Sequence, residues 1–242
     1  MSESLRRPLK AGVVGAGVFG AHHARKYART AGVELAAVFA PAVGHARSVT
    51  AEVGGRAASS LDELLDAVDI VTVASPASTH AEVARLALAA GKPTYVEKPL
   101  ATRLDDGDAL IAAAERAGVV LACGHQERAV IGALGLDRAA ERPLRIEAVR
   151  RGTPHGRNLD VSAVLDLMVH DLDLALWLSA AQPIAVESEG GADACVAEVT
   201  FDSGLDARFD CARNAEVRER RLLVTYPSGE VAVDFLTLTV TN

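Results

Sequence analysis

The sequence predicts an α/β doubly wound parallel sheet followed by an α+β domain with an open-faced antiparallel sheet. In the first half, short apolar runs rich in β-branched residues alternate with alanine-rich helical runs. A glycine turn joins the first apolar run to the first helical run. In the second half, the expected strands alternate apolar and polar residues, which indicates a sheet with one covered face.

The first domain is expected over residues 1–124. Its strands are nearly all apolar, which is typical of a parallel sheet that is covered by helices on both faces. Gly91 follows one of the helical runs and favours the left-handed conformation that ends helices. A strand that enters a turn is expected at 10–17, further strands at 33–40, 69–75, 93–99 and 119–125, and helices at 18–30, 43–54, 61–67, 78–91 and 104–118.

The second domain is expected over residues 125–242. After a helical stretch near 128–140 come a strand at 144–152, a helix at 164–178 and strands at 194–201, 204–213 and 229–235. Within 204–213 the side chains at 205, 207, 209 and 211 are apolar, and those at 206, 208 and 210 are charged. Short glycine turns at 202–204 and 227–229 predict a meandering antiparallel sheet.

Composition excludes several classes of protein. The 242 residues carry 32 acidic and 25 basic side chains, a net charge of −7, which argues against a surface for nucleic acid or anionic membrane. Cys123, Cys195 and Cys211 are odd in number and form no metal-type pair, which fits a reducing compartment. The first residues lack an apolar signal core and no run approaches a membrane span, so we expect a soluble cytoplasmic protein.

The run "VVGAGVFG" contains glycines at 15, 17 and 20, in the spacing of a dinucleotide-binding loop. Gly15 permits a tight turn, Gly17 lets the backbone approach a pyrophosphate, and Gly20 allows close packing of helix and strand. Together with Val18 and Phe19 they are the expected cofactor-binding loop. The alternative is an ordinary strand–helix turn that binds no nucleotide.

The choice between NAD and NADP stays open. Ala40 stands at the end of the second strand, where an acidic residue would hold the ribose hydroxyls of NAD. Arg47 is close in sequence and is a candidate for a 2′-phosphate, or else a surface residue of the next helix.

Two further segments follow strands, at the end of the sheet where doubly wound folds bind ligands. Ser75, Pro76 and His80 in "ASPASTH" and Glu97 in "YVEKPLA" are therefore expected to contact the cofactor. Lys98 is also expected there, as a partly desolvated proton donor or acceptor. The alternative for Lys98 is a pair with Glu97 on a solvated loop.

The run "VLDLMVHDLDLALWL" at 164–178 is apolar except for a few titratable residues. On a regular helix Asp166, His170 and Asp173 fall in one stripe, which must face a wet cleft or a polar network. Asp171 lies off the stripe and is expected to cap or pair locally. Three interpretations compete for Asp166 and His170: a catalytic pair, a buried structural pair, and a metal site for which a third firm ligand is missing.

These motifs together resemble the Gfo/Idh/MocA family of NAD(P)-dependent oxidoreductases. The resemblance rests on "GAGVFGAHHA", on "ASPASTHAEVARLALAAGKPTYVEKPLA" and on the helix with Asp166 and His170. It implies a Rossmann domain that binds NAD or NADP without a metal, proton transfer by Lys98 and His170, and assistance by Asp166. It also implies a homodimer or homotetramer that pairs through the open sheet. The sequence departs from the family pattern at Val161-Ser162, Met168 and Ala40.

A narrower resemblance comes from "GHQERAV", "RIEAVRRGTPHGRNLDVSAVLDLMVHDLDLAL" and "YPSGEVAVDFL". These segments are similar to the branch that contains the UDP-N-acetylglucosamine 3-dehydrogenases. A loop with Arg150, Arg151 and Arg157 would then grip a sugar-nucleotide diphosphate, unless it is a solvated basic loop. The substrate-binding set is completed by His125, Arg128 and Asp173. Family members usually continue past residue 242, so we expect a C-terminally short second domain.

The predicted function is oxidation of a ring hydroxyl of a sugar or nucleotide sugar, with UDP-N-acetylglucosamine at C3 as the specific candidate. One alternative is a dehydrogenase of a free sugar or inositol-like polyol. The other is a non-catalytic regulator that binds a dinucleotide.

Overall fold

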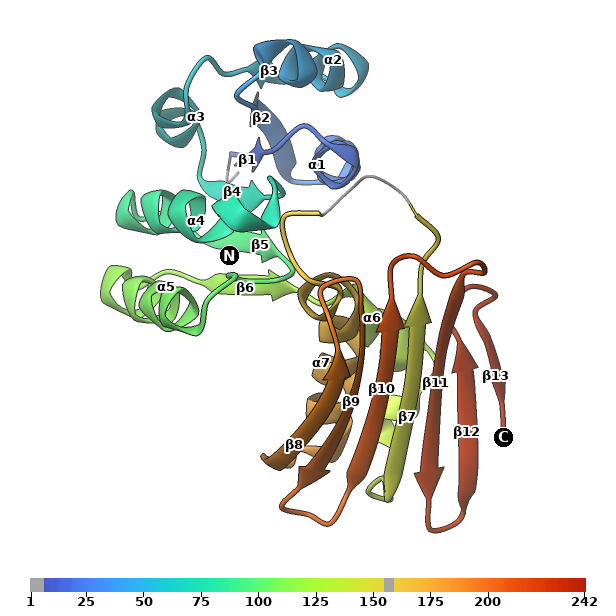
Figure 1. The fold of residues 1–242 in the computed structure, drawn as a ribbon. Coiled ribbons are helices and arrows are strands. Elements are labelled where there is room, and N and C mark those ends of the chain that lie inside the picture. Colours follow the sequence, from blue (N-terminus) through green and yellow to red (C-terminus); the bar gives the residue numbers. More distant parts are fainter. Residues whose placement is uncertain (1–6, 155–158) are drawn as a thin grey trace, which may run out of the picture. The chain divides into compact units, whose positions relative to one another are not determined.

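The computed structural model describes residues 7–154 and 159–242. The chain forms two compact units that divide between Gly124 and His125 (Figure 1). In the described part of the chain, no helix has both the length and the apolar character needed to cross a membrane.

Unit 1 is built on a six-stranded sheet whose neighbouring strands all run parallel. The strand order is β3-β2-β1-β4-β5-β6, so the direction of winding reverses between β1 and β4. In such sheets ligands bind at the carboxyl ends of the strands near this reversal. The strands are β1 (Leu9–Val14), β2 (Val33–Phe39), β3 (Arg56–Ala57), β4 (Ile70–Val73), β5 (Thr94–Glu97) and β6 (Leu121–Gly124).

Helices cover both faces of this sheet. Val13 and Val14 are neighbours on β1, yet their buried side chains belong to two different apolar clusters, one on each face. The predicted doubly wound α/β fold is therefore confirmed. The helices are α1 (Val18–Arg29), α2 (Val43–Val53), α3 (Leu61–Ala67), α4 (His80–Ala89) and α5 (Leu104–Ala117), with a 3₁₀ turn η1 (Ala77–Thr79) before α4.

Unit 2 is built on a seven-stranded sheet in the order β13-β12-β11-β7-β10-β9-β8. Figure 1 shows α6 and α7 behind the strands. The strands are β7 (Arg145–Arg151), β8 (Pro183–Gly190), β9 (Ala194–Phe201), β10 (Asp206–Ala212), β11 (Glu219–Tyr226), β12 (Gly229–Asp234) and β13 (Thr239–Thr241). The helices are α6 (Gln126–Ala133) and α7 (Val169–Ser179), with the short turns η2 (Leu136–Arg138) and η3 (Val164–Met168).

The core of unit 2 lies between this sheet and its helices. On β10, Ala207, Phe209 and Cys211 are buried in that core, and the charged residues between them lie on the other face. The expected α+β unit with one uncovered sheet face is therefore confirmed.

Three details of unit 2 differ from the sequence prediction. The sheet is not a plain meander, because its first strand β7 lies in the middle and runs parallel to β10. The helix expected to reach residue 140 ends at Ala133, and Gly135 follows with a positive φ of 75°. The run at 164–178 begins with the π-helical turn η3, and regular α-helix starts only at Val169.

Candidate functional site

Each of the three glycines in the predicted cofactor loop suits its position for a different reason. Gly15 has a φ of 105°, and a Cβ there would overlap the carbonyl of Ala74 at the end of β4. A Cβ on Gly20 would overlap the carbonyl of Gly15, so α1 packs directly against the turn. Around Gly17 there is no other atom within 4 Å of an added Cβ. Gly17 is therefore the position that leaves room for a ligand to approach the backbone.

The start of α1 suits an anion. Its N-cap is Gly17, no side chain caps it, and the first turn contains no acidic residue. Val18 and Phe19 are 52% and 43% exposed beside this turn. Backbone N–H groups at the start of a helix favour a phosphate group, so the turn fits the pyrophosphate of NAD or NADP.

His80 is placed differently from the prediction that it contacts the cofactor. Its side chain is only 2% exposed, and both ring nitrogens lie against backbone oxygens. Nε2 is 2.9 Å from the carbonyl of Ser75, and Nδ1 is 2.7 Å from the carbonyl of Pro99. His80 thus links the segment after β4, where Pro76 is exposed, to the segment after β5. It supports these two segments from inside instead of facing a ligand.

Glu97, at the end of β5, pairs with a histidine of α1. The Nε2–H of His23 donates to Oε1 of Glu97 at 2.6 Å, and the His23 ring lies 5.3 Å from that of Tyr95. Burial, reinforced by the nearby charge of Glu97, raises the pKa of Tyr95 to about 12. Lys98 follows at once and is half-buried, and the Lys98–Pro99 peptide bond is cis.

The contacts of unit 1 thus gather the predicted cofactor residues at one edge of its sheet. The backbone of Gly15 touches the Ala74–Ser75 segment, and His80 connects Ser75 to the segment that carries Lys98. His23 was not among the predicted site residues. The signal for it was a titratable side chain one helical turn after Gly20, on a helix that packs against the glycine turn.

In unit 2, Asp166 and His170 are 4% and 7% exposed on the run that opens with η3. A π turn closes i→i+5 hydrogen bonds, so successive side chains are separated by less than the 100° assumed for a regular helix. The angular spacing assumed for the predicted stripe therefore changes at this turn, and Asp166, His170 and Asp173 are all buried. Such π-helical turns are frequent at functional sites.

Asp173 forms a cluster with the two predicted substrate residues of the α6 region. The guanidinium of Arg128 donates to both carboxylate oxygens of Asp173 at 2.7 and 2.5 Å. Nδ1 of His125 lies 3.4 Å from the same carboxylate. Arg128 also lies over the ring of Trp177 at 5.4 Å, with its side chain 45% exposed. The structure therefore brings His125, Arg128 and Asp173 together, with Arg128 facing solvent.

Arg150 is placed differently from the loop position predicted for it. It lies on β7, is 1% exposed, and donates to both oxygens of Asp171 at 2.9 and 2.8 Å. It also donates to Glu127 of α6 at 2.9 Å and stacks on Phe235. Arg150 is enclosed by protein, so the prediction that it grips a diphosphate is wrong. The prediction that Asp171 pairs locally is also wrong, because its partner lies on another element.

Two carboxylates are hydrogen-bonded to the one guanidinium of Arg150, and the charge of Arg220 on the neighbouring strand β11 acts on the same cluster. Burial alone would lower the pKa of Arg150, but the hydrogen bond and charge of Asp171, together with Glu127, raise it. Burial raises the pKa of Asp171, and the hydrogen bond from Arg150 offsets only part of that effect. Arg150 therefore stays charged. The cost of burying the cluster shows instead as the raised pKa of Asp171.

The other two arginines of the predicted loop do not join this cluster. Arg151 is the next residue on β7 and faces the uncovered side of the sheet, where it pairs with Asp210 at 2.5 Å. It therefore lies on the face opposite to Arg150 and α7, and not in a loop as predicted. Arg157 lies outside the described residues.

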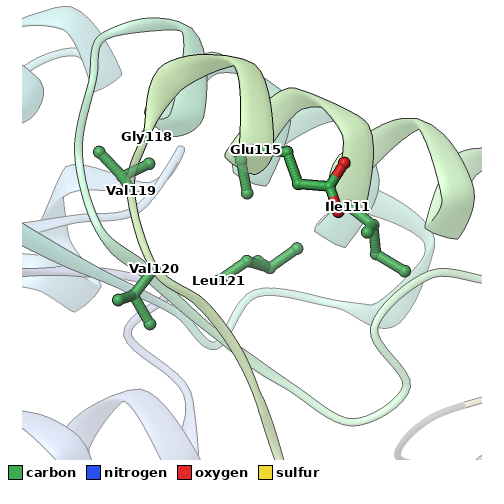
Figure 2. Close-up of a pocket in the computed structure, with 7 residues that line it drawn as sticks. Ile111, Glu115, Gly118, Val119, Val120 and Leu121 are labelled. Carbon is green, nitrogen blue, oxygen red and sulfur yellow. The ribbon is translucent and has the colours of Figure 1, made fainter.

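Two further features bear on the site. A hollow of about 430 Å³ lies between the end of α5 and the start of β6. Figure 2 shows side chains that line it, among them Ile111 and Val120. It lies at the amino end of β6, the opposite end of the sheet from the glycine turn. Across residues 7–154 and 159–242, no group of three or more His, Cys, Asp or Glu side chains is arranged to hold a metal ion.

Comparison with known proteins places the chain in a family. Residues 9–125 match the Gfo/Idh/MocA model, described as an oxidoreductase family with an NAD-binding Rossmann fold. The chain is 36% identical to UDP-N-acetylglucosamine 3-dehydrogenase of Acidithiobacillus ferrooxidans, over 96% of this chain and 76% of that one. It is also 32% identical to inositol 2-dehydrogenase of Cereibacter sphaeroides, over 70% of this chain and 54% of that one.

Solved structures agree with these matches. The structure of the Acidithiobacillus ferrooxidans enzyme superimposes with a TM-score of 0.91, over 96% of this chain and 79% of that one. GenD2 from gentamicin A biosynthesis, solved in complex with NAD, is 27% identical with a TM-score of 0.83, over 97% of this chain and 74% of that one. The chain therefore belongs to the Gfo/Idh/MocA family of oxidoreductases, whose Rossmann fold binds NAD.

Proposed function

We propose that the chain is an NAD(P)-dependent dehydrogenase that oxidises a ring hydroxyl of a nucleotide sugar, with UDP-N-acetylglucosamine at C3 as the specific substrate. The observation that carries this proposal is the 36% identity, over 96% of the chain, to an enzyme named for that reaction. The glycine turn that fits a pyrophosphate and the buried Asp166 and His170 support it independently of the sequence match.

The proposed chemistry divides between the cofactor and the protein. The bound dinucleotide supplies the hydride acceptor. His170 or Lys98 takes the hydroxyl proton as the hydride leaves the carbon that carries the hydroxyl, and Asp166 supports His170. The buried position of Asp166 and His170 excludes water from their surroundings, which strengthens the electrostatic effect of one group on the other.

The substrate contacts are proposed for the α6 region. Arg128 is 45% exposed, while Asp173 and Trp177 hold its guanidinium in place. A guanidinium of this kind suits one phosphate of a diphosphate. His125 belongs to the same cluster and is proposed as a second contact.

A free polyol is the second candidate substrate. The inositol 2-dehydrogenases of Cereibacter sphaeroides and Saccharopolyspora erythraea are 32% and 35% identical to this chain, each over 70% of its length. Such a substrate has no diphosphate, so Arg128 would be dispensable for its binding.

Formation of NADH and NADPH tests the proposal, measured with UDP-N-acetylglucosamine, free N-acetylglucosamine and myo-inositol. We expect turnover with the nucleotide sugar alone, and loss of turnover in Lys98→Met and His170→Ala. Activity with free polyols only would reject the nucleotide sugar and favour the second candidate. NADH binding without turnover of any of these compounds would favour a regulator that binds the cofactor without catalysis.

Arg128→Gln tests the proposed contact between Arg128 and a phosphate of the nucleotide sugar. Loss of a charged contact to a phosphate costs about 1.5–3 kcal/mol, so the KM for UDP-N-acetylglucosamine is expected to rise about 10-fold or more. Arg151→Gln is the matched control, because Arg151 faces the uncovered side of the sheet. An unchanged KM in Arg128→Gln would remove Arg128 from the proposed substrate site.

We also propose that copies of the chain pair through the uncovered face of the seven-stranded sheet, as a homodimer or homotetramer. This face carries Val149, Leu223 and Ala232, which line a groove of about 420 Å³ among charged side chains. Apolar side chains on an open sheet face favour contact with another protein surface.

A further inference from the structure

Lys98 lies between two residues that are each bound by a histidine. On one side, Glu97 accepts a hydrogen bond from Nε2 of His23 at 2.6 Å. On the other side, the carbonyl of Pro99 lies 2.7 Å from Nδ1 of His80. We call His23 and His80 the histidine brace.

The first half of the brace starts at the glycine turn. Gly20 packs against the carbonyl of Gly15 without room for a Cβ, so the start of α1 is fixed on the turn. His23 comes one helical turn later, and its side chain is 23% exposed. Its bond to Glu97 is charge-assisted and partly shielded from water, which makes it stronger than an exposed pair.

Glu97 has little freedom to move away from this bond. A Cβ on Gly124 would overlap the Tyr95 hydroxyl and would lie 3.3 Å from Oε2 of Glu97. The ring of Tyr95 packs on His23 as well. One carboxylate oxygen of Glu97 is therefore bound by His23 while the other lies against the backbone of β6.

The second half of the brace starts at the segment after β4. Nε2 of His80 lies 2.9 Å from the carbonyl of Ser75, and the side chain is 2% exposed. Each ring nitrogen lies within hydrogen-bond distance of one carbonyl, so the ring is held between the two segments. Ser75 itself adjoins Gly15, so this half also ends at the glycine turn.

We propose that His23 and His80 are positioning residues that fix the backbone of Lys98 relative to the glycine turn, and hence relative to a bound dinucleotide. This inference rests on the proposed dehydrogenase function. A displacement of about 1 Å in a catalytic group can cost about 100-fold in rate, so the brace acts on kcat more than on cofactor binding.

The test compares His23→Ala and His80→Ala with His22→Ala, whose side chain is the exposed neighbour of His23 on α1. Each brace variant is expected to lower kcat about 10-fold or more, whereas the dissociation constant of NADH changes less than about 3-fold. His22→Ala is expected to match the wild type. His23→Gln keeps an N–H donor near the position of Nε2 and is expected to recover most of the lost kcat.

A second readout is independent of turnover. The backbone amide signal of Lys98 in a ¹⁵N–¹H spectrum is expected to shift or broaden in both brace variants and in Glu97→Gln, and to stay in place in His22→Ala. His80→Gln replaces His80→Ala if removal of the buried ring prevents folding.

The outcomes separate the inference from the function on which it rests. An unmoved Lys98 signal, or a kcat that stays at the wild-type value, would overturn the brace. A brace variant that loses only thermal stability would also overturn it, by showing a purely structural role. If the wild-type protein turns over no sugar or polyol, the proposed function fails, and the Lys98 signal still decides whether the brace holds the segment.

Discussion

At the scale of single residues, the three glycines of the cofactor turn show how one residue type serves unlike purposes. Gly15 is required by its own positive φ and by the carbonyl of Ala74, and Gly20 by the carbonyl of Gly15. Gly17 has a φ of −77°, a conformation that any residue adopts, and it faces open space. At Gly15 and Gly20 the missing side chain makes room for the protein's own backbone. Only at Gly17 does it leave room for a ligand.

Gly17→Ala and Gly20→Ala should therefore separate binding from stability. Gly17→Ala is expected to cost at most about 1 kcal/mol in the free energy of unfolding, because nothing in the protein meets the new methyl group and only the N-cap preference for glycine over alanine is lost. It should weaken NADH binding about 10-fold or more, equivalent to about 1.4 kcal/mol, by holding the pyrophosphate off the backbone. Gly20→Ala is expected to destabilise the protein by about 1–3 kcal/mol.

Thermal unfolding and fluorescence titration with NADH measure the two effects in the same samples. Unchanged NADH affinity in Gly17→Ala would show that the dinucleotide does not approach the turn at this residue. An equal loss of stability in the two variants would contradict the different surroundings of Gly17 and Gly20.

At the scale of elements, the cluster of Glu127, Arg150 and Asp171 joins α6, β7 and α7. Each of the three side chains is at most 6% exposed, so their charges are compensated mainly by one another. Because Asp171 is the neighbour of His170, this cluster also fixes the rotation of α7. The cluster therefore orients the helix that carries the candidate proton-transfer residue.

Arg150→Met tests this role. The substitution leaves two buried carboxylates without their guanidinium and is expected to cost about 3–5 kcal/mol in the free energy of unfolding. Arg151→Met is the matched control on the same strand, where a surface ion pair is worth about 0–1 kcal/mol. Fluorescence of Trp177, the chain's single tryptophan, follows the urea-induced unfolding of unit 2. Equal midpoints for the two variants would mean that the cluster does not stabilise the unit.

The same elements show how far the sequence alone leads. Continuous apolar runs predicted the parallel sheet, and the alternation at 205–211 predicted the covered face of β10. Alternation says which face a residue occupies and not which strand is its neighbour, so the parallel pairing of β7 with β10 could not be predicted. The π turn was hidden because its residues are apolar on nearly every side.

For the site, local motifs predicted the residues, and their contacts depended on tertiary structure. The glycine spacing and the segments after the strands predicted residues that the structure brings close together in unit 1. Arg150, His80 and Glu97 each have a partner that lies between 19 and 74 residues away in the sequence, and no spacing rule could have found those partners. As a result two residues assigned to ligands, His80 and Arg150, turned out to be buried supports.

At the scale of the whole molecule, the two units distribute their apolar surface differently. Unit 1 covers both faces of its sheet, whereas unit 2 covers one face and leaves the other to side chains of β7, β11 and β12. On that face Leu223 lies between Glu147 and Ala232 of the neighbouring strands. Ion pairs such as Arg151–Asp210 and Arg208–Glu198 cover other parts of the same face.

If copies of the chain pair through this face, Leu223→Glu should separate them. The substitution places a carboxylate beside Glu147 in the middle of the contact, where both charges would lose water without gaining a partner. Molar mass measured by light scattering is expected to fall by half, from that of a dimer to that of one chain or from that of a tetramer to that of a dimer. Leu104→Glu, at an 80% exposed position of unit 1, is the control and should leave the mass unchanged. A wild-type protein with the mass of one chain, or a Leu223→Glu variant with the same mass as the wild-type oligomer, would reject pairing through this face.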